Sequence, residues 1–125
     1  MLKDSYDKNP LTLQIILDYH FLAMQHNPEI AGKIRKIEVH ISGNPSFKIT
    51  RAKNIERDLE ELITRYNEFT KKEKAPLKEI LDFAVYFHNE FQHIHPFEDG
   101  NSRITRLITF HLLQSKNIPI LDLPF

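Results

Sequence analysis

The sequence predicts a mainly α-helical domain that carries one small β-hairpin. Apolar residues recur at helical spacing in four separate segments, and a single segment alternates apolar and polar residues. The length of 125 residues fits one domain, and a hydrophobic content of 41% is enough for a modest core. We therefore expect residues 1–125 to form a single domain.

The composition excludes several classes of function. Lysine plus arginine equals aspartate plus glutamate at 17 each, so no overall field draws the chain to nucleic acid or to an anionic membrane. The chain has no cysteine, which excludes disulfides and thiolate metal sites and fits a reducing compartment. The first residues, MLKDSYDKNP, lack the apolar segment of a signal peptide. We expect a cytoplasmic protein with neither nucleic-acid nor membrane partners.

The first two elements differ in their period. A helix is expected from about Pro10 to Gln25, because proline suits a first helical turn and apolar residues follow at helical spacing. The next stretch, KIEVHISGNPSFKIT, alternates on both sides of a turn and predicts a hairpin. Its apolar positions are Ile37, Val39, Ile41, Phe47 and Ile49. On periodicity alone, this hairpin either covers the edge of the core or binds a ligand.

Three further helices follow. The second begins after Asn54, a good N-cap, and the third begins near Pro76. The fourth begins near Gly100 or Asn101 and ends before KNIP. The inner face predicted for the third helix comprises Leu77, Ile80, Leu81, Ala84, Val85, His88 and Phe91, and that of the fourth comprises Ile104, Leu107, Ile108, His111 and Leu112.

The polar loop HPFEDGNSR, residues 95–103, joins the last two helices and has the makings of a phosphate site. The backbone N–H groups of Gly100, Asn101 and Ser102 would open a new helix, whose N-terminus attracts anions. Arg103 and Arg106 are three residues apart and share a helix face, so two guanidinium groups could hold further phosphate oxygens. The loop is suited to a polyphosphate.

Two other loop residues complete a possible reactive site. Asp99 could hold Mg²⁺ together with phosphate oxygens, and Glu98 could compete for this role. His95 is the group whose ordinary pKa suits removal of a proton near neutral pH. A base, a metal ligand and an anion site together fit attack of a hydroxyl group on phosphorus.

The same residues also allow plainer interpretations. Asp99 or Asn101 could simply cap the helix, and the arginines could pair with surface carboxylates. A weaker alternative is a metal site formed by His88, His93 and His95, whose spacing suits one helix face poorly. The remaining histidines are expected to be packed or exposed without a functional role: His20, His26, His40 and His111.

The segment HPFEDGNSRITR, from His95 to Arg106, resembles the signature of the Fic family: histidine, any residue, phenylalanine, any residue, acidic residue, glycine, asparagine, glycine, arginine, two residues, arginine. LDFAVYFHNEFQHIHPF resembles the helix that leads into that signature, and RLITFHLLQSKNIPIL the helix that leaves it. GKIRKIEVHISG is similar to the lead-in of the family's hairpin flap. The resemblance covers roughly residues 30 to 122.

This resemblance implies a helical Fic fold and a protein adenylyltransferase, which moves AMP from ATP to a serine, threonine or tyrosine hydroxyl of a target protein. His95 would be the general base, Asp99 would hold Mg²⁺, and Phe97 would anchor the loop. Gly100 and Asn101 would line the anion hole, Ser102 would lie close to the phosphates, and Arg103 and Arg106 would hold the β- and γ-phosphates of ATP. The hairpin from Ile37 to Ile49 would be the flap that aligns the target by strand addition.

Ser102 departs from the pattern because it stands where the family has a glycine. Its side chain would crowd the nucleotide or donate a hydrogen bond to it, which leaves open transfer of another group, such as phosphoryl or another nucleotidyl group. The short chain leaves open a nucleotide-binding regulatory module with little turnover. The family's inhibitory pattern also fails, because Phe69 follows the Thr64 to Glu68 spacing. We expect either a separate, antitoxin-like inhibitory partner or a core fragment that lacks the inhibitory and C-terminal helices.

Overall fold

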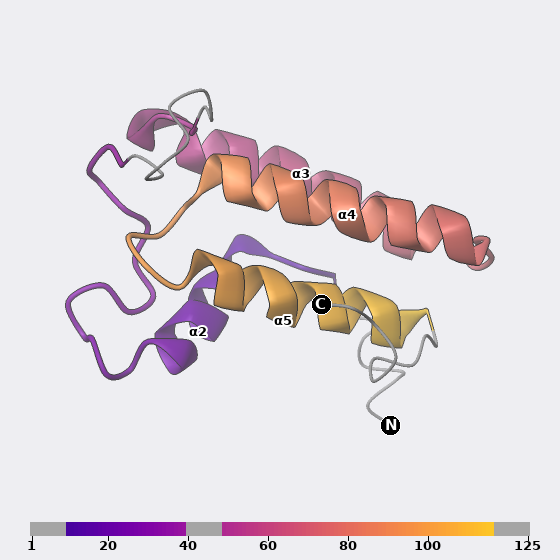
Figure 1. The fold of residues 1–125 in the computed structure, drawn as a ribbon, viewed down its shortest axis with the longest axis horizontal. Helices are drawn as coiled ribbons and strands as arrows, with labels where there is room; N and C mark the ends of the chain where they lie inside the picture. Colours follow the sequence, from indigo (N-terminus) through magenta and orange to yellow (C-terminus); the bar gives the residue numbers. More distant parts are fainter. Residues whose placement is uncertain (1–9, 40–48, 117–125) are drawn as a thin grey trace.

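The fold, seen in a computed structural model that describes residues 10–39 and 49–116, consists of helices with no strand in those ranges. The elements are α2 (Leu13–Ala23), the short 3-10 helix η1 (Ala52–Asn54), α3 (Ile55–Thr70), α4 (Leu77–Ile94) and α5 (Asn101–Ser115). Helices α3 and α4 form an antiparallel pair, α5 packs against α4, and α2 lies against α5 (Figure 1). The predicted mainly α class is confirmed.

Helix α2 is shorter than the predicted range from Pro10 to Gln25. Its N-cap is Thr12, whose hydroxyl accepts a hydrogen bond from a backbone N–H of the first turn. The backbone N–H and C=O of Leu11 both bond to the side-chain amide of Asn67 in α3, at 2.8 and 2.9 Å. These backbone groups are taken by a tertiary contact, so the helix cannot begin at the proline.

The other three helices begin where the sequence predicts. Asn54 occupies the N-cap of α3, although its side chain makes no capping hydrogen bond and a 3-10 turn precedes it. Helix α4 follows Pro76, and α5 follows Gly100, whose φ of 86° lies in the left-handed region. That conformation, which glycine adopts without steric penalty, separates α5 from the preceding loop.

The buried face of α4 agrees with the prediction at Ile80, Ala84 and Phe91, but it also includes Phe87 and Ile94, and Leu81 and His88 are only partly buried. Its buried residues are Ile80, Ala84, Phe87, Phe91 and Ile94. Leu77 and Val85 were expected inside but are 59% and 53% exposed. Val85 follows Ala84, and one residue turns a helical side chain by about 100°, away from the buried stripe. Leu77 is the first residue of the helix and lies at its exposed end.

An aromatic cluster ties α3 to α4. The rings of Phe69 and Phe83 stack with their centroids 4.3 Å apart, and Tyr66 meets Phe87 edge to face at 5.5 Å. This core continues to Phe97, which is fully buried in the loop between α4 and α5. The loop is thereby part of the core rather than a segment draped over it.

The predicted hairpin lies partly outside the described residues, which exclude Ile41 and Phe47. Ile37, Val39 and Ile49 are described and have no strand assignment. The two segments that would enter and leave the hairpin do come together, because the side chain of Arg35 bonds to the carbonyl groups of both Ile37 and Thr50. None of the described helices is long and apolar enough to cross a lipid bilayer.

Replacing a core aromatic residue tests this packing. Phe91 is fully buried, so Phe91→Ala should lower the free energy of unfolding in urea by about 3–5 kcal/mol. Val85→Ala on the same helix should change it by no more than about 0.5 kcal/mol, because Val85 is exposed. Equal effects of the two substitutions would contradict the assigned face of α4.

Candidate active site

The loop between α4 and α5 borders a cleft of about 270 Å³ at one end of the bundle. The cleft is lined by His95, Glu98, Asp99, Gly100, Asn101, Ser102, Arg103 and Arg106. Every polar residue that the sequence singled out in this loop therefore borders one cavity. The described flap residues Ile37, Val39 and Ile49 are not among its lining residues.

His95 ends helix α4 in an unusual conformation. Its φ of 48° is the positive value of a left-handed residue, and its N–H donates to the carbonyl of Phe91 at 2.9 Å. A non-glycine residue in this region costs about 1 kcal/mol or more, so the surrounding structure must enforce it. The reversal of chain direction brings the imidazole to the cleft.

The surroundings of His95 favour the neutral form of its imidazole. Burial is the main cause that lowers its pKa, and the positive charge of Arg35 lowers it further, while the carbonyl of Gln92 acts in the opposite direction. The Nδ1 atom is buried and makes no hydrogen bond of acceptable geometry within the described residues. A neutral imidazole near pH 7 is the form that can accept a proton.

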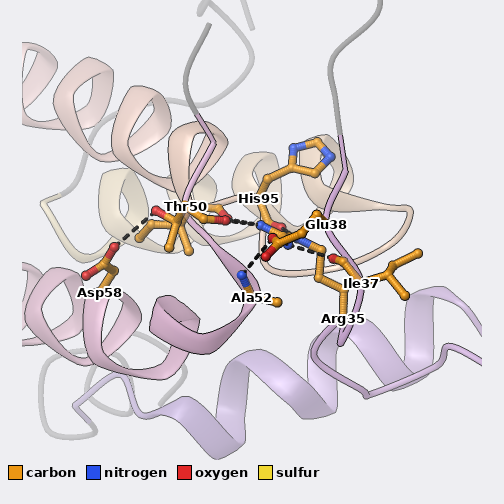
Figure 2. A network of polar contacts seen from close by, with 8 residues as sticks. Arg35, Ile37, Glu38, Thr50, Ala52, Asp58 and His95 are labelled. Atoms are coloured by element: carbon orange, nitrogen blue, oxygen red, sulfur yellow. Dashed lines mark hydrogen bonds and ion pairs between the residues drawn. The ribbon is translucent and has the colours of Figure 1, made fainter.

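Arg35 binds the backbone at the end of α4, including that of His95, a contact that we did not expect from the sequence. Its side chain is fully buried, and Nε donates to the carbonyl of His95 at 2.6 Å. The two terminal nitrogens donate to the carbonyl groups of Ile37, Ile94 and Thr50 (Figure 2). One guanidinium thus joins the end of α4 to both segments that flank residues 40–48.

The surroundings of Arg35 extend this network. Glu38 lies 3.5 Å from the guanidinium and also accepts the N–H of Ala52 at 2.9 Å (Figure 2). The hydroxyl of Thr50 donates to Asp58 of α3 at 3.0 Å. The sequence did contain a signal for Arg35, because it lies two residues before Ile37, on the apolar side of the alternating segment. A charged residue at an apolar position of such a pattern indicates a buried, partnered charge.

His20 supports the loop from the other side. It is fully buried, and its ring stacks on Phe97 with centroids 3.7 Å apart. Nδ1 accepts the N–H of Gly32 at 2.9 Å, so the proton belongs on Nε2, which donates to the carbonyl of Asp99 at 2.9 Å. Burial lowers its pKa despite the nearby carboxylate of Asp99. His20 is packed, one of the two outcomes that the sequence allowed for it. Its hydrogen bond to the carbonyl of Asp99 was not predicted.

Gly100 and Asn101 have structural roles in the loop. A Cβ atom on Gly100 would lie 2.9 Å from Sδ of Met24, so glycine lets the end of α2 pack beneath the loop. The buried amide of Asn101 accepts the N–H of Phe97 at 3.0 Å and donates to its carbonyl at 2.7 Å. Both backbone groups of the loop anchor are therefore satisfied by one side chain.

The N-terminus of α5 retains unpaired donors. No side chain caps it, and the first backbone hydrogen bond of the helix is donated by Ile104 to the carbonyl of Gly100. Arg103 donates to the carbonyl of Ala23 at 3.1 Å, and both Arg103 and Arg106 are exposed and line the cleft. The helix dipole and two guanidinium groups therefore act on the same space, an arrangement suited to phosphate.

Ser102 and Asp99 flank that anion site. The hydroxyl of Ser102 accepts a hydrogen bond from the side-chain amide of Gln92 at 3.1 Å, which links α5 to α4. The exposed carboxylate of Asp99 accepts the N–H of Gly100 at 2.8 Å through one oxygen. Its second oxygen makes no hydrogen bond with the described residues, so it is available to a hard cation.

The alternative metal site is not assembled. Within residues 10–39 and 49–116 no three histidine or carboxylate side chains are grouped to hold a metal ion. His88, His93 and His95 are all described, so they do not form the cluster that was considered. A single carboxylate beside an anion site fits Mg²⁺ better, because Mg²⁺ keeps several waters and combines one or two carboxylates with phosphate.

The fold and the cleft define a helical domain in which an uncapped helix N-terminus and two arginines lie beside a buried histidine. Comparisons with known proteins agree: a family model described as the Fic/DOC family matches residues 10–113. The chain is 29% identical over 122 residues to "Protein adenylyltransferase Fic" of Drosophila persimilis, covering 94% of this chain and 22% of that protein. For the protein of the same name in Culex quinquefasciatus the identity is 30% over 110 residues, covering 87% and 21%.

The chain belongs to the Fic/DOC family, because the family model matches most of its length. It spans about a fifth of the length of the curated relatives that it matches.

The double hydrogen bond of Asn101 can be tested by unfolding. Asn101→Ala leaves the buried N–H and C=O of Phe97 without partners, so we expect the free energy of unfolding in urea to fall by about 1–3 kcal/mol. Asn89→Ala is the matched control on the exposed side of α4, with an expected change within about 0.5 kcal/mol. Equal losses in both variants would show that the amide does not hold the loop.

Proposed function

We propose that this domain transfers AMP from ATP to a serine, threonine or tyrosine hydroxyl of a target protein. The observation that carries the proposal is a neutral histidine beside an uncapped helix N-terminus that also presents two arginines. The curated relatives bear the name protein adenylyltransferase, which agrees with this activity. ATP is then the second substrate.

His95 is the general base of the proposed reaction. Because Nδ1 is buried, Nε2 is the ring nitrogen that takes the proton from the target hydroxyl. The hydroxyl oxygen forms a bond to the α-phosphorus as the bond from that phosphorus to the bridging oxygen of the β-phosphate breaks. Pyrophosphate leaves with the electron pair of the broken bond, and the product is a phosphodiester on the target.

The start of α5 binds the phosphates in this proposal. The backbone N–H groups of Asn101 and Ser102 face the charge that develops in the transition state, with Gly100 beside them. Arg103 and Arg106 hold the β- and γ-phosphates. The bond between Arg103 and the carbonyl of Ala23 uses one terminal nitrogen, which leaves the other donors of that guanidinium for the ligand.

Asp99 would hold Mg²⁺ through its free oxygen. The ion would supply neutralisation of the phosphate charge and orientation of the triphosphate. His20 helps in this role, because its bond to the Asp99 carbonyl fixes the backbone from which the carboxylate extends. The hydroxyl of Ser102 accepts a hydrogen bond from Gln92 and therefore keeps its own hydrogen to donate to a phosphate oxygen.

The flap from Ile37 to Ile49 would align the target by strand addition. Ile37 is 54% exposed, as a residue that receives another chain needs to be. Val39 and Ile49 belong to the same proposed surface, together with Ile41 and Phe47. We also retain a separate inhibitory protein as a partner and a cytoplasmic location, both of which rest on the sequence.

Intact-mass analysis tests the activity directly. After incubation of the chain with a lysate, ATP and Mg²⁺, we expect proteins that carry one adenylyl group, and none with His95→Ala. His26→Ala is the control, because His26 is exposed and remote in sequence from the loop. A phosphoryl adduct would reject adenylyl transfer in favour of the alternative chemistry. Calorimetric binding of ATP without any adduct would indicate a binding module.

The pH profile reports the protonation of the base. His95 works when deprotonated, and burial and Arg35 lower its pKa below the ordinary value of 6.5. The rate should therefore rise with pH, with a midpoint below 6.5, and should be level from about pH 7 upward. Initial rates of adenylyl transfer across pH 5 to about 8.5 measure this curve. A midpoint above 6.5 would contradict a base whose neutral form is favoured.

A further inference from the structure

Arg35 is a charged group buried where charges are seldom found. Its side chain has no exposed surface, and within the described part of the chain its one ion-pair partner is Glu38, at 3.5 Å, whose own side chain is 62% exposed. The guanidinium is stabilised mainly by four backbone carbonyl groups. An apolar side chain of similar size is often at least as stabilising as a buried ion, so stability alone is a weak reason for this arginine.

The carbonyl groups that Arg35 binds come from three separate segments. His95 and Ile94 end helix α4, Ile37 precedes residues 40–48, and Thr50 follows them. The backbone N–H of Arg35 adds a bond to the carbonyl of Pro96 at 2.9 Å. The histidine and both ends of the flap segment therefore meet at one planar group (Figure 2).

We propose that Arg35 is a positioning residue that holds the end of α4 so that the imidazole of His95 faces the reacting groups in the cleft. This inference rests on the proposed function, because the position of His95 matters only if its imidazole takes a proton from a target hydroxyl. A misplacement of about 1 Å between reacting groups can cost about a hundredfold in rate.

The geometry of the guanidinium suits this task. Its nitrogens are fixed in one plane, so the three segments are held at set distances, whereas a lysine ammonium is a single point with a flexible stem. Besides the bond from the N–H of Arg35 to Pro96, the described residues of this region have a backbone bond from the N–H of Thr50 to the carbonyl of His93, at 2.9 Å. That bond reaches the end of α4 but neither His95 nor the segment at Ile37.

Arg35 also leaves a spectroscopic signature on His95. The pKa of the imidazole is lowered by burial first and by the charge of Arg35 second. Among the described residues, the charged groups that line the cleft with His95 are Glu98, Asp99, Arg103 and Arg106, and His93 lies two residues before it on α4. All of them are retained when Arg35 alone is replaced, so a change in the titration reports the guanidinium.

The test compares Arg35→Lys and Arg35→Met with Arg51→Met. Arg51 is exposed and adjacent to Thr50, so its replacement removes one positive charge from the same region and leaves the hydrogen bonds of Arg35 in place. Three measurements are made on each folded variant: titration of the His95 imidazole by NMR, ATP binding by calorimetry, and the initial rate of adenylyl transfer to a fixed lysate. Calorimetric stoichiometry gives the fraction of intact sites, to which each rate is normalised.

We expect Arg35→Met to raise the pKa of His95 and Arg35→Lys to leave it near the wild-type value, because lysine keeps the charge. Both should reduce the rate per intact site by about ten- to a hundredfold, with ATP affinity unchanged. Arg51→Met should change none of the three. A full rate in Arg35→Lys, or an unchanged His95 titration in Arg35→Met, would overturn the proposal.

Glu38→Ala covers the case in which the Arg35 variants do not fold. Glu38 is largely exposed, and its loss removes the ion pair to Arg35 and the bond to Ala52 while leaving the core intact. We expect a rate lower by about two- to fivefold, which corresponds to the loss of a weak ion pair. A wild-type rate would count against a positioning role of Arg35. If the wild-type chain modifies no protein, the proposed activity fails, whereas the NMR titration still decides whether Arg35 controls His95.

Discussion

The guanidinium of Arg35 is the contact on which the arrangement of the site depends. It satisfies carbonyl groups at the end of α4 and at both ends of residues 40–48, and it is fully buried while doing so. Polar groups removed from water must find partners. If these carbonyl groups separated, the buried charge of Arg35 would lose its hydrogen-bond partners. The left-handed turn at His95 persists because its carbonyl is held in this way.

A second set of buried polar contacts completes the loop. His20 fixes the carbonyl of Asp99 and stacks on Phe97, and Asn101 satisfies both backbone groups of Phe97. Some of the residues that border the cleft, such as Asn101, therefore have a structural role in the loop. Gly100, for example, avoids Met24 while it also opens helix α5. The exposed groups that remain, Arg103 and Arg106 among them, are those suited to a phosphate ligand.

The sequence predicted local features better than distant partners. The start of α5 and the gathering of His95, Asp99 and Arg106 followed from helix periodicity and from the closeness of these residues in one short loop, which are local features. Periodicity predicts which residues of a helix are buried only where a neighbouring element covers that part of the helix. Leu77, at the first position of α4, is exposed although it fits the pattern. Arg35 and His20 find their loop partners 60 and 79 residues further along the chain. Spacing along the chain contains no information about such contacts.

Native-state hydrogen exchange of the ligand-free chain tests most directly whether buried partners hold the loop in place. The amides of Arg35 and Phe97 donate to the carbonyl of Pro96 and to the side chain of Asn101, and that of Thr50 donates to the carbonyl of His93. If the contacts of Arg35 and Asn101 hold the loop in place, these three amides should exchange only on global unfolding, with the same protection free energy as the interior of α4. Exchange at the rate of an open loop, while α4 stays protected, would contradict the account.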